Sequence, residues 1–168
     1  HYHMGIEALG KCIGAETIRS NDDGAPDIVW VFPSKSFTFE AKVNKQGKNS
    51  MSKTNIQQAE GHSDWLVSKR PEINNKDITT AVIAKTSTVK ESAEPFIKNL
   101  KFISTEQMEI FSDKVFSTLK EIRTEFNGKE YNTVFSELKF KIKDLGIDIE
   151  SLENLFATSL IDVAVIKK

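Results

Sequence analysis

Residues 27–43 constrain the fold more than any other segment of the chain, because their pattern predicts a β-hairpin. The run from Asp27 to Phe32 is rich in β-branched and aromatic side chains, which favour extended structure. Residues 33–36, Pro-Ser-Lys-Ser, supply turn chemistry, and residues 37–43 alternate apolar and polar side chains with the period of a strand. We therefore expect two antiparallel strands, with the rest of the domain built around them.

The segments on either side of the hairpin predict helices and further strands. By apolar spacing, helices are expected over residues 4–14, 55–68 and 91–98, from Met108 to Ile122, and from Tyr131 onward. Further strands are expected over residues 15–19, 78–86 and 100–104. A strand–helix–strand order beside a hairpin predicts an α/β fold, with a mixed central β-sheet flanked by helices and a C-terminal helical extension.

The length of 168 residues predicts one domain with a proper core. Residues 1–4, His-Tyr-His-Met, are more typical of a tag remnant than of native sequence. Residues 127–168 are interpreted as a helical extension packed on the core, although a dimer face or a partner dock is an alternative. No apolar run is long enough for a membrane span, and the single Cys12 excludes an internal disulfide. We expect a cytoplasmic protein without membrane contact.

Charge is distributed unevenly along the chain, although the formal net charge is only −1. Residues 35–70 hold seven basic and three acidic side chains, a local charge of +4, whereas residues 91–168 hold eleven basic and fourteen acidic ones. A basic segment beside the hairpin is what a phosphate backbone would need. Lys45, Lys48 and Lys53 are the candidates for such contacts, the alternative being a loop of solvated lysines.

Alternation along the second hairpin strand places Glu40 and Lys42 on one face and the apolar side chains on the other. The apolar side should face the core, which leaves the acid and the lysine on an open face. A turn centred on Ser34-Lys35 pairs residue 27 with 42 and residue 29 with 40. Asp27 then lies opposite Lys42 and diagonal to Glu40, and a one-residue shift would move it to the wrong face.

Two carboxylates with a nearby backbone carbonyl form a hard oxygen site suited to Mg²⁺ or Mn²⁺. Such an ion polarises a phosphoryl oxygen and generates a nucleophile from bound water at neutral pH. Lys42 would position or deprotonate that water and offset the charge of the transition state. The alternative interpretation is structural, with Asp27 as a turn residue and Glu40–Lys42 as an exposed pair.

Gly24-Ala25-Pro26-Asp27, followed after a strand–turn–strand by Glu40-Ala41-Lys42, resembles the PD-(D/E)xK nuclease superfamily, which has the restriction-endonuclease-like fold. The helix–strand–hairpin–helix–strand core of that superfamily corresponds to residues 5–126. The resemblance implies that Asp27 and Glu40 are metal ligands and that Lys42 is catalytic. It also implies a Mg²⁺- or Mn²⁺-dependent endonuclease acting on DNA, with RNA left open.

The resemblance extends to two helices that flank the hairpin. An acid on the first helix often joins the metal site, and Glu7 is the positional match. A glutamine often follows the motif strand, for which Gln58 is the first choice and Gln57 the second. His62 on the same helix could donate to a phosphate, although a surface or satisfied helix residue is the simpler interpretation.

Modules of this kind often serve restriction, phage defence or repair, as homodimers or with a fused or partner helicase or recognition domain. One alternative is a nuclease-like fold that no longer cleaves and acts as a nucleic-acid-binding or assembly module. Another is an α/β interaction domain in which the motif is accidental. Phosphate-binding glycine loops and a Gly-x-Ser-x-Gly elbow do not occur, and one Cys with three His excludes a zinc cluster.

Overall fold

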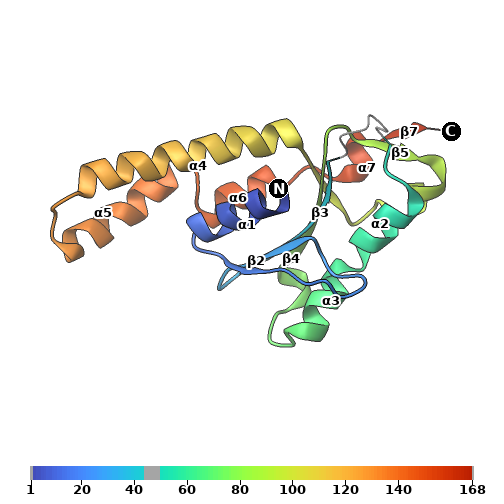
Figure 1. Ribbon diagram of the computed structural model, residues 1–168, viewed down its shortest axis with the longest axis horizontal. Coiled ribbons are helices and arrows are strands. Elements are labelled where there is room, and N and C mark those ends of the chain that lie inside the picture. Colours follow the sequence, from blue (N-terminus) through green and yellow to red (C-terminus); the bar gives the residue numbers. More distant parts are fainter. Residues whose placement is uncertain (1, 44–49, 168) are drawn as a thin grey trace.

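The computed structural model describes residues 2–43 and 50–167, which form an α/β protein built on a mixed five-stranded sheet (Figure 1). Its strands, in spatial order, are β1 (Glu16–Ile18), β2 (Ile28–Val31), β3 (Ser36–Lys42), β4 (Ile78–Ala84) and β6 (Lys101–Ser104). β1, β2 and β3 pair antiparallel, whereas β3, β4 and β6 pair parallel. The predicted class, a mixed sheet flanked by helices, is confirmed.

Helices account for most of the remaining chain. They are α1 (Tyr2–Cys12), α2 (Lys53–Glu60), α3 (His62–Lys69), α4 (Thr105–Phe126), α5 (Tyr131–Asp144), α6 (Ile149–Leu155) and α7 (Leu160–Val163), with 3₁₀ turns η1 (Asn75–Asp77) and η2 (Glu91–Phe96). The single helix expected over residues 55–68 divides at Gly61, and the helix expected over 91–98 is a 3₁₀ turn that contains Pro95. None of these described helices is long and apolar enough to cross a membrane.

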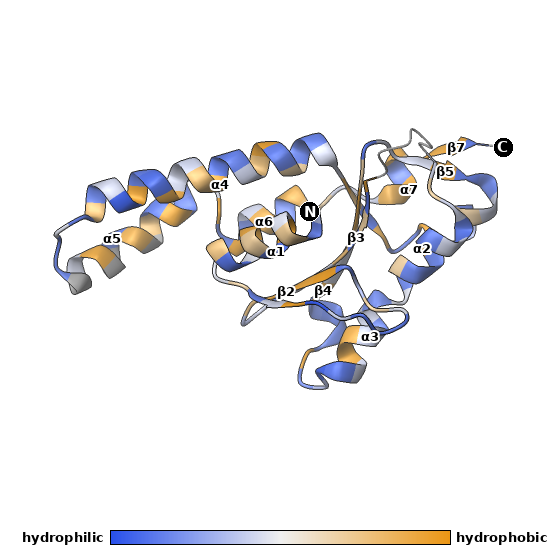
Figure 2. Ribbon diagram, in the orientation of Figure 1, coloured by the Kyte–Doolittle hydropathy of each residue, from blue (hydrophilic) through white to orange (hydrophobic). Residues whose placement is uncertain are grey.

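One face of the sheet packs against α1, α4 and α6 around a cluster of aromatic rings. The rings of Phe37 and Phe39 lie 5.1 and 5.3 Å from that of Phe156, which comes just after α6. Helix α1 is fixed to the sheet by Trp30, whose Nε1 donates to the Ile6 carbonyl at 3.1 Å. Tyr2 also packs against this cluster and, with His3 and Met4, begins α1. This face is therefore the main hydrophobic core, and the ribbon near the β2 and β4 labels carries the hydrophobic colour of Figure 2.

The opposite face of the sheet is also covered, by α2, α3 and η2. Ile56, Ala59 and Leu66 from α2 and α3 have no exposed surface. Beneath them, Thr38 and Thr80 form a hydrogen bond of 2.8 Å between neighbouring strands. The expectation that this face of the hairpin is open was wrong, because the two short helices seal it.

Residues 147–160, which we name the C-terminal strap, pass from one face of the sheet to the other around β6. Phe156 is buried on the first face and Leu160 on the second. Between them, the Phe102 N–H donates to the Thr158 carbonyl at 2.9 Å, and the Leu160 N–H donates to the Leu100 carbonyl at 2.8 Å. The strap thus covers the outer edge of the sheet.

The end of the described chain departs from the predicted all-helical extension. Residues Val165–Lys167 form β7, which pairs parallel with β5 (Thr88–Lys90) in a second, two-stranded sheet. Neither strand was predicted, because residues 165–167 were assigned to the helical extension and residues 88–90 lie between the expected strand over 78–86 and the expected helix over 91–98. On the other side of the molecule, α5 and the distal half of α4 extend away from the main sheet (Figure 1).

Candidate metal and catalytic site

The hairpin register decides where the two candidate carboxylates lie. A backbone hydrogen bond of 2.8 Å from the Phe32 N–H to the Lys35 carbonyl closes a turn with Pro33-Ser34 at its centre. Val29 therefore faces Thr38, whereas the predicted register paired residue 29 with residue 40. The prediction was wrong by two residues, and a shift of two leaves every side chain on its original face.

Asp27 is fastened to β3 by two hydrogen bonds. Its N–H donates to the Phe39 carbonyl at 3.0 Å, and its Oδ2 accepts from the Ala41 N–H at 2.7 Å. The same oxygen lies 3.7 Å from Nε2 of His3 in α1, and about a quarter of the Asp27 side chain is exposed. Asp27 is thus half-buried and lies next to the Glu40-Ala41-Lys42 segment, with its carboxylate held by the Ala41 N–H.

Glu40 is the most deeply placed member of the predicted site, with 1% of its surface exposed. Lys42 Nζ contacts its Oε1, and Nε2 of His62 lies 3.3 Å from its Oε2. Within the described residues, neither carboxylate oxygen has a partner with acceptable hydrogen-bond geometry, and neither do the two ring nitrogens of His62. Buried polar atoms usually have such a partner, which makes these four atoms the candidates for binding a cation or for hydrogen bonding to each other.

Electrostatic effects couple the ionisation of Glu40 and His62 to the charges of Asp27 and Lys42. Burial raises the pKa of Glu40, Lys42 opposes this rise, and the negative charge of Asp27 adds to it. Burial lowers the pKa of His62 to about 4, against the opposing effect of Asp27. His62 is therefore neutral at pH 7, and its contact with Glu40 is not an ion pair.

The donor set of this cluster fits a hard divalent cation. Asp27 and Glu40 supply carboxylates, and both Glu40 oxygens are buried, with Oε1 in contact with Lys42 and Oε2 facing His62. Among the described residues no three acidic, histidine or cysteine side chains are grouped as a complete metal cage. Mg²⁺ does not require such a cage, because it is usually bound by one or two carboxylates while keeping several waters. The residues present therefore fit Mg²⁺ or Mn²⁺.

Glu7, the predicted acid of the first helix, is engaged elsewhere. Its Oε1 lies 2.6 Å from Nζ of Lys11, and its Oε2 lies 3.3 Å from Nη1 of Arg19. The hydrogen bond from Lys11 is the main cause of its lowered pKa. Glu7 is one helical turn from His3, and the structure shows no contact between Glu7 and either candidate ligand.

The helix that follows the hairpin places the other predicted residues differently. Gln58 is half-buried in α2, one turn before His62, and Gln57 is exposed. His62, expected near the surface as a phosphate donor, is completely buried beside Glu40. The missed signal is the spacing of residues 56, 59, 62 and 66, which places His62 on the buried face of the helical segment.

Much of the predicted basic patch is neutralised by nearby acids. Lys35 pairs with Glu153, Lys69 with Asp22, and Arg70 with Glu16 and Glu72. Lys53 begins α2, exposed, with its Nζ 5.3 Å from the centre of the Phe96 ring. Lys45 and Lys48 lie outside the described residues. Of the three predicted backbone contacts, only Lys53 therefore has a described position.

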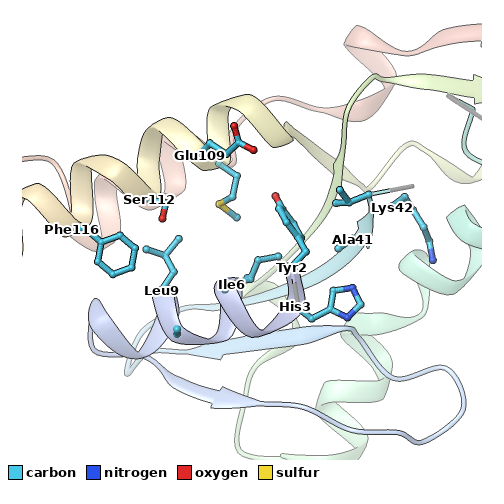
Figure 3. A pocket seen from close by; sticks show the side chains of 13 residues that line it. Tyr2, His3, Ile6, Leu9, Ala41, Lys42, Glu109, Ser112 and Phe116 are labelled. Carbon is cyan, nitrogen blue, oxygen red and sulfur yellow. The ribbon is translucent and has the colours of Figure 1, made fainter. Parts of the chain in front are cut away.

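A groove of about 860 Å³ runs between α1, α4 and the end of β3, and Lys42 lines it, whereas Asp27, Glu40 and His62 do not. Figure 3 shows Lys42, Ala41 and His3 at one end of it and Phe116 and Leu9 at the other. The groove joins the lysine of the motif to the solvent, so a ligand in it would reach the end of β3 without passing through the core.

Comparisons of the chain with protein-family models, with curated proteins and with solved structures found no match.

Proposed function

We propose that this protein is a metal-dependent nuclease that hydrolyses DNA, with the PD-(D/E)xK type of site. The observation that carries the proposal is the buried Glu40 carboxylate. Lys42 contacts one of its oxygens, neither oxygen has a well-formed hydrogen bond among the described residues, and the negative charge of Asp27 helps to raise its pKa. A protein that needed only a stable hairpin would gain little from burying an acid there, since the carboxylate loses its hydration and Lys42 contacts only one of its oxygens. Binding of a cation would offset that loss.

Each member of the cluster has a distinct role in this proposal. Asp27 and Glu40 would hold Mg²⁺ or Mn²⁺, and the ion would supply Lewis-acid polarisation of a phosphoryl oxygen and an acidified water. Lys42, about a quarter exposed, extends from the buried carboxylate toward solvent. Its ammonium would orient the attacking water and stabilise the negative charge that develops on the phosphate. The Ala41 N–H holds the Asp27 carboxylate against β3.

Plasmid cleavage tests this assignment directly. Supercoiled and single-stranded DNA, with RNA in a parallel reaction, would be incubated with Mg²⁺, Mn²⁺ or EDTA. We expect metal-dependent cleavage that falls by about 10²–10³-fold in Lys42→Ala, the loss typical of removing one group that stabilises a transition state. Lys120→Ala, which removes an exposed lysine from α4, should cleave like the wild type. Cleavage in EDTA, or equal loss in both variants, would contradict the proposal.

A second function, an assembly or nucleic-acid-binding module that does not cleave, is favoured by one observation. Glu40 is almost fully buried and already contacts Lys42, so the motif is neutralised without a metal. In that case the wild type would retard DNA in a gel with EDTA present and cleave nothing when Mg²⁺ or Mn²⁺ is added. For either function, the proposed settings are restriction, phage defence and repair. The proposed partners are a second copy of the chain, a helicase or a recognition domain.

A further inference from the structure

His62 has the placement of a residue that acts on Glu40 rather than on a substrate. It opens α3 directly after Gly61, where the helical segment divides, and it has no exposed surface. Its neighbours on the same buried face are Ala59, three residues earlier, and Leu66, four residues later. A phosphate in solvent cannot reach this imidazole, so contact with nucleic acid does not explain it.

The two oxygens of Glu40 are approached from different elements. Lys42, on the same strand, contacts Oε1, whereas His62 comes from α3 and places Nε2 3.3 Å from Oε2. This separation is within hydrogen-bond range, yet the Nε2–H is not aligned with the oxygen. Hydrogen bonds around catalytic groups are often long or misaligned before ligands bind, and they shorten afterwards. Nε2 of His62 and Oε2 of Glu40 are therefore close enough for a hydrogen bond that needs only a change of orientation.

We propose that His62 is a positioning residue, which donates its Nε2–H to Oε2 of Glu40 and holds that carboxylate in the orientation that binds the cation. The inference rests on the proposed metal site and adds a residue to it. A glutamate side chain has three rotatable bonds, and a single lysine contact leaves its second oxygen free to turn. A ring held by the packing of α3 restricts that rotation. Partners of this kind typically change metal affinity by about 10- to 100-fold when they are lost.

Mn²⁺ binding, measured by electron paramagnetic resonance of the free ion, tests the proposal without using activity. We expect His62→Leu to weaken Mn²⁺ binding by about 10- to 100-fold. His62→Gln, which keeps an N–H donor, should recover most of that loss. Leu66→Val, on the same buried face but without a polar group, should lower stability and leave Mn²⁺ affinity unchanged. Wild-type affinity in folded His62→Leu, or equal weakening in Leu66→Val, would overturn the proposal.

Nitrogen-15 NMR of the imidazole in the metal-free wild type separates this inference from the proposed function. At pH 7.5 we expect the proton on Nε2, with a resonance that shifts in Glu40→Gln. A proton on Nδ1 would overturn the positioning role, even if His62→Leu failed to fold. If the wild type binds no Mn²⁺ while the Nε2–H resonance responds to Glu40→Gln, the metal site fails and the His62–Glu40 hydrogen bond stands.

Discussion

Acid should destabilise this protein through His62. Burial lowers the pKa of the imidazole to about 4, against 6.5 as its ordinary value. The folded state therefore favours the neutral ring, and this contribution to stability is complete above about pH 6.5 and is lost as the pH falls to about 4. The two pKa values differ by about 2.5, and at 1.36 kcal/mol for each pKa unit this corresponds to about 3 kcal/mol of unfolding free energy. His62→Gln has no ring to protonate and should not show this loss.

Urea unfolding at a series of pH values between 7.5 and 4 would measure the effect. The free energy of unfolding of the wild type should fall by about 3 kcal/mol relative to His62→Gln across this range. Glu40 acts in the opposite direction, because its raised pKa means that acid relieves the cost of burying its charge. Both proteins keep Glu40, so the comparison isolates the histidine. A difference that stays constant within about 0.5 kcal/mol would refute the reasoning.

Two further predictions concern packing, and both are measured by thermal or urea unfolding. Phe156→Ala should lower the free energy of unfolding by about 3–5 kcal/mol, because it empties the centre of the aromatic cluster. Phe140→Ala, at a side chain that is 72% exposed, should lower it by less than about 0.5 kcal/mol. Similar losses in the two variants would contradict the buried position of the strap. Gly10→Ala should destabilise by about 1–3 kcal/mol because its Cβ would overlap the indole of Trp30. Gly5→Ala, in the same helix with nothing within 4 Å, should gain up to about 1 kcal/mol, and a comparable gain at Gly10 would contradict this packing.

The sequence was sufficient to predict the sheet, because its strong signals are periodic. The alternation of residues 37–43 and the apolar run of 78–86 predicted the two central strands to within two residues. The faces of the hairpin were also predicted correctly relative to each other, although the register was not. That error arose at the turn, where Pro33 takes the first central position and so moves the centre by one residue.

The surroundings of the site could not be predicted, because they depend on contacts between distant segments. The alternation of polar and apolar residues predicts that Glu40 and the apolar side chains lie on opposite faces of the strand, but it does not predict which elements cover each face. The cover comes from α2 and α3, and the break at Gly61 turns His62 inward. The pairing of Lys35 with Glu153 is equally non-local, so a basic count along residues 35–70 overstated the free positive charge.

The C-terminal strap also has a consequence for how the chain folds. It brings Phe156 into contact with Phe39, more than 100 residues earlier in the sequence. Within a few residues it also packs a side chain against each face of the sheet and forms hydrogen bonds along the β6 edge. Contacts over such separations form slowly, because the entropy of closing a long loop is lost before the contacts repay it. We expect an early state with the sheet assembled, the β6 edge unpaired and two apolar surfaces uncovered. Such a state is prone to intermolecular strand pairing, so refolding yield should fall as protein concentration rises.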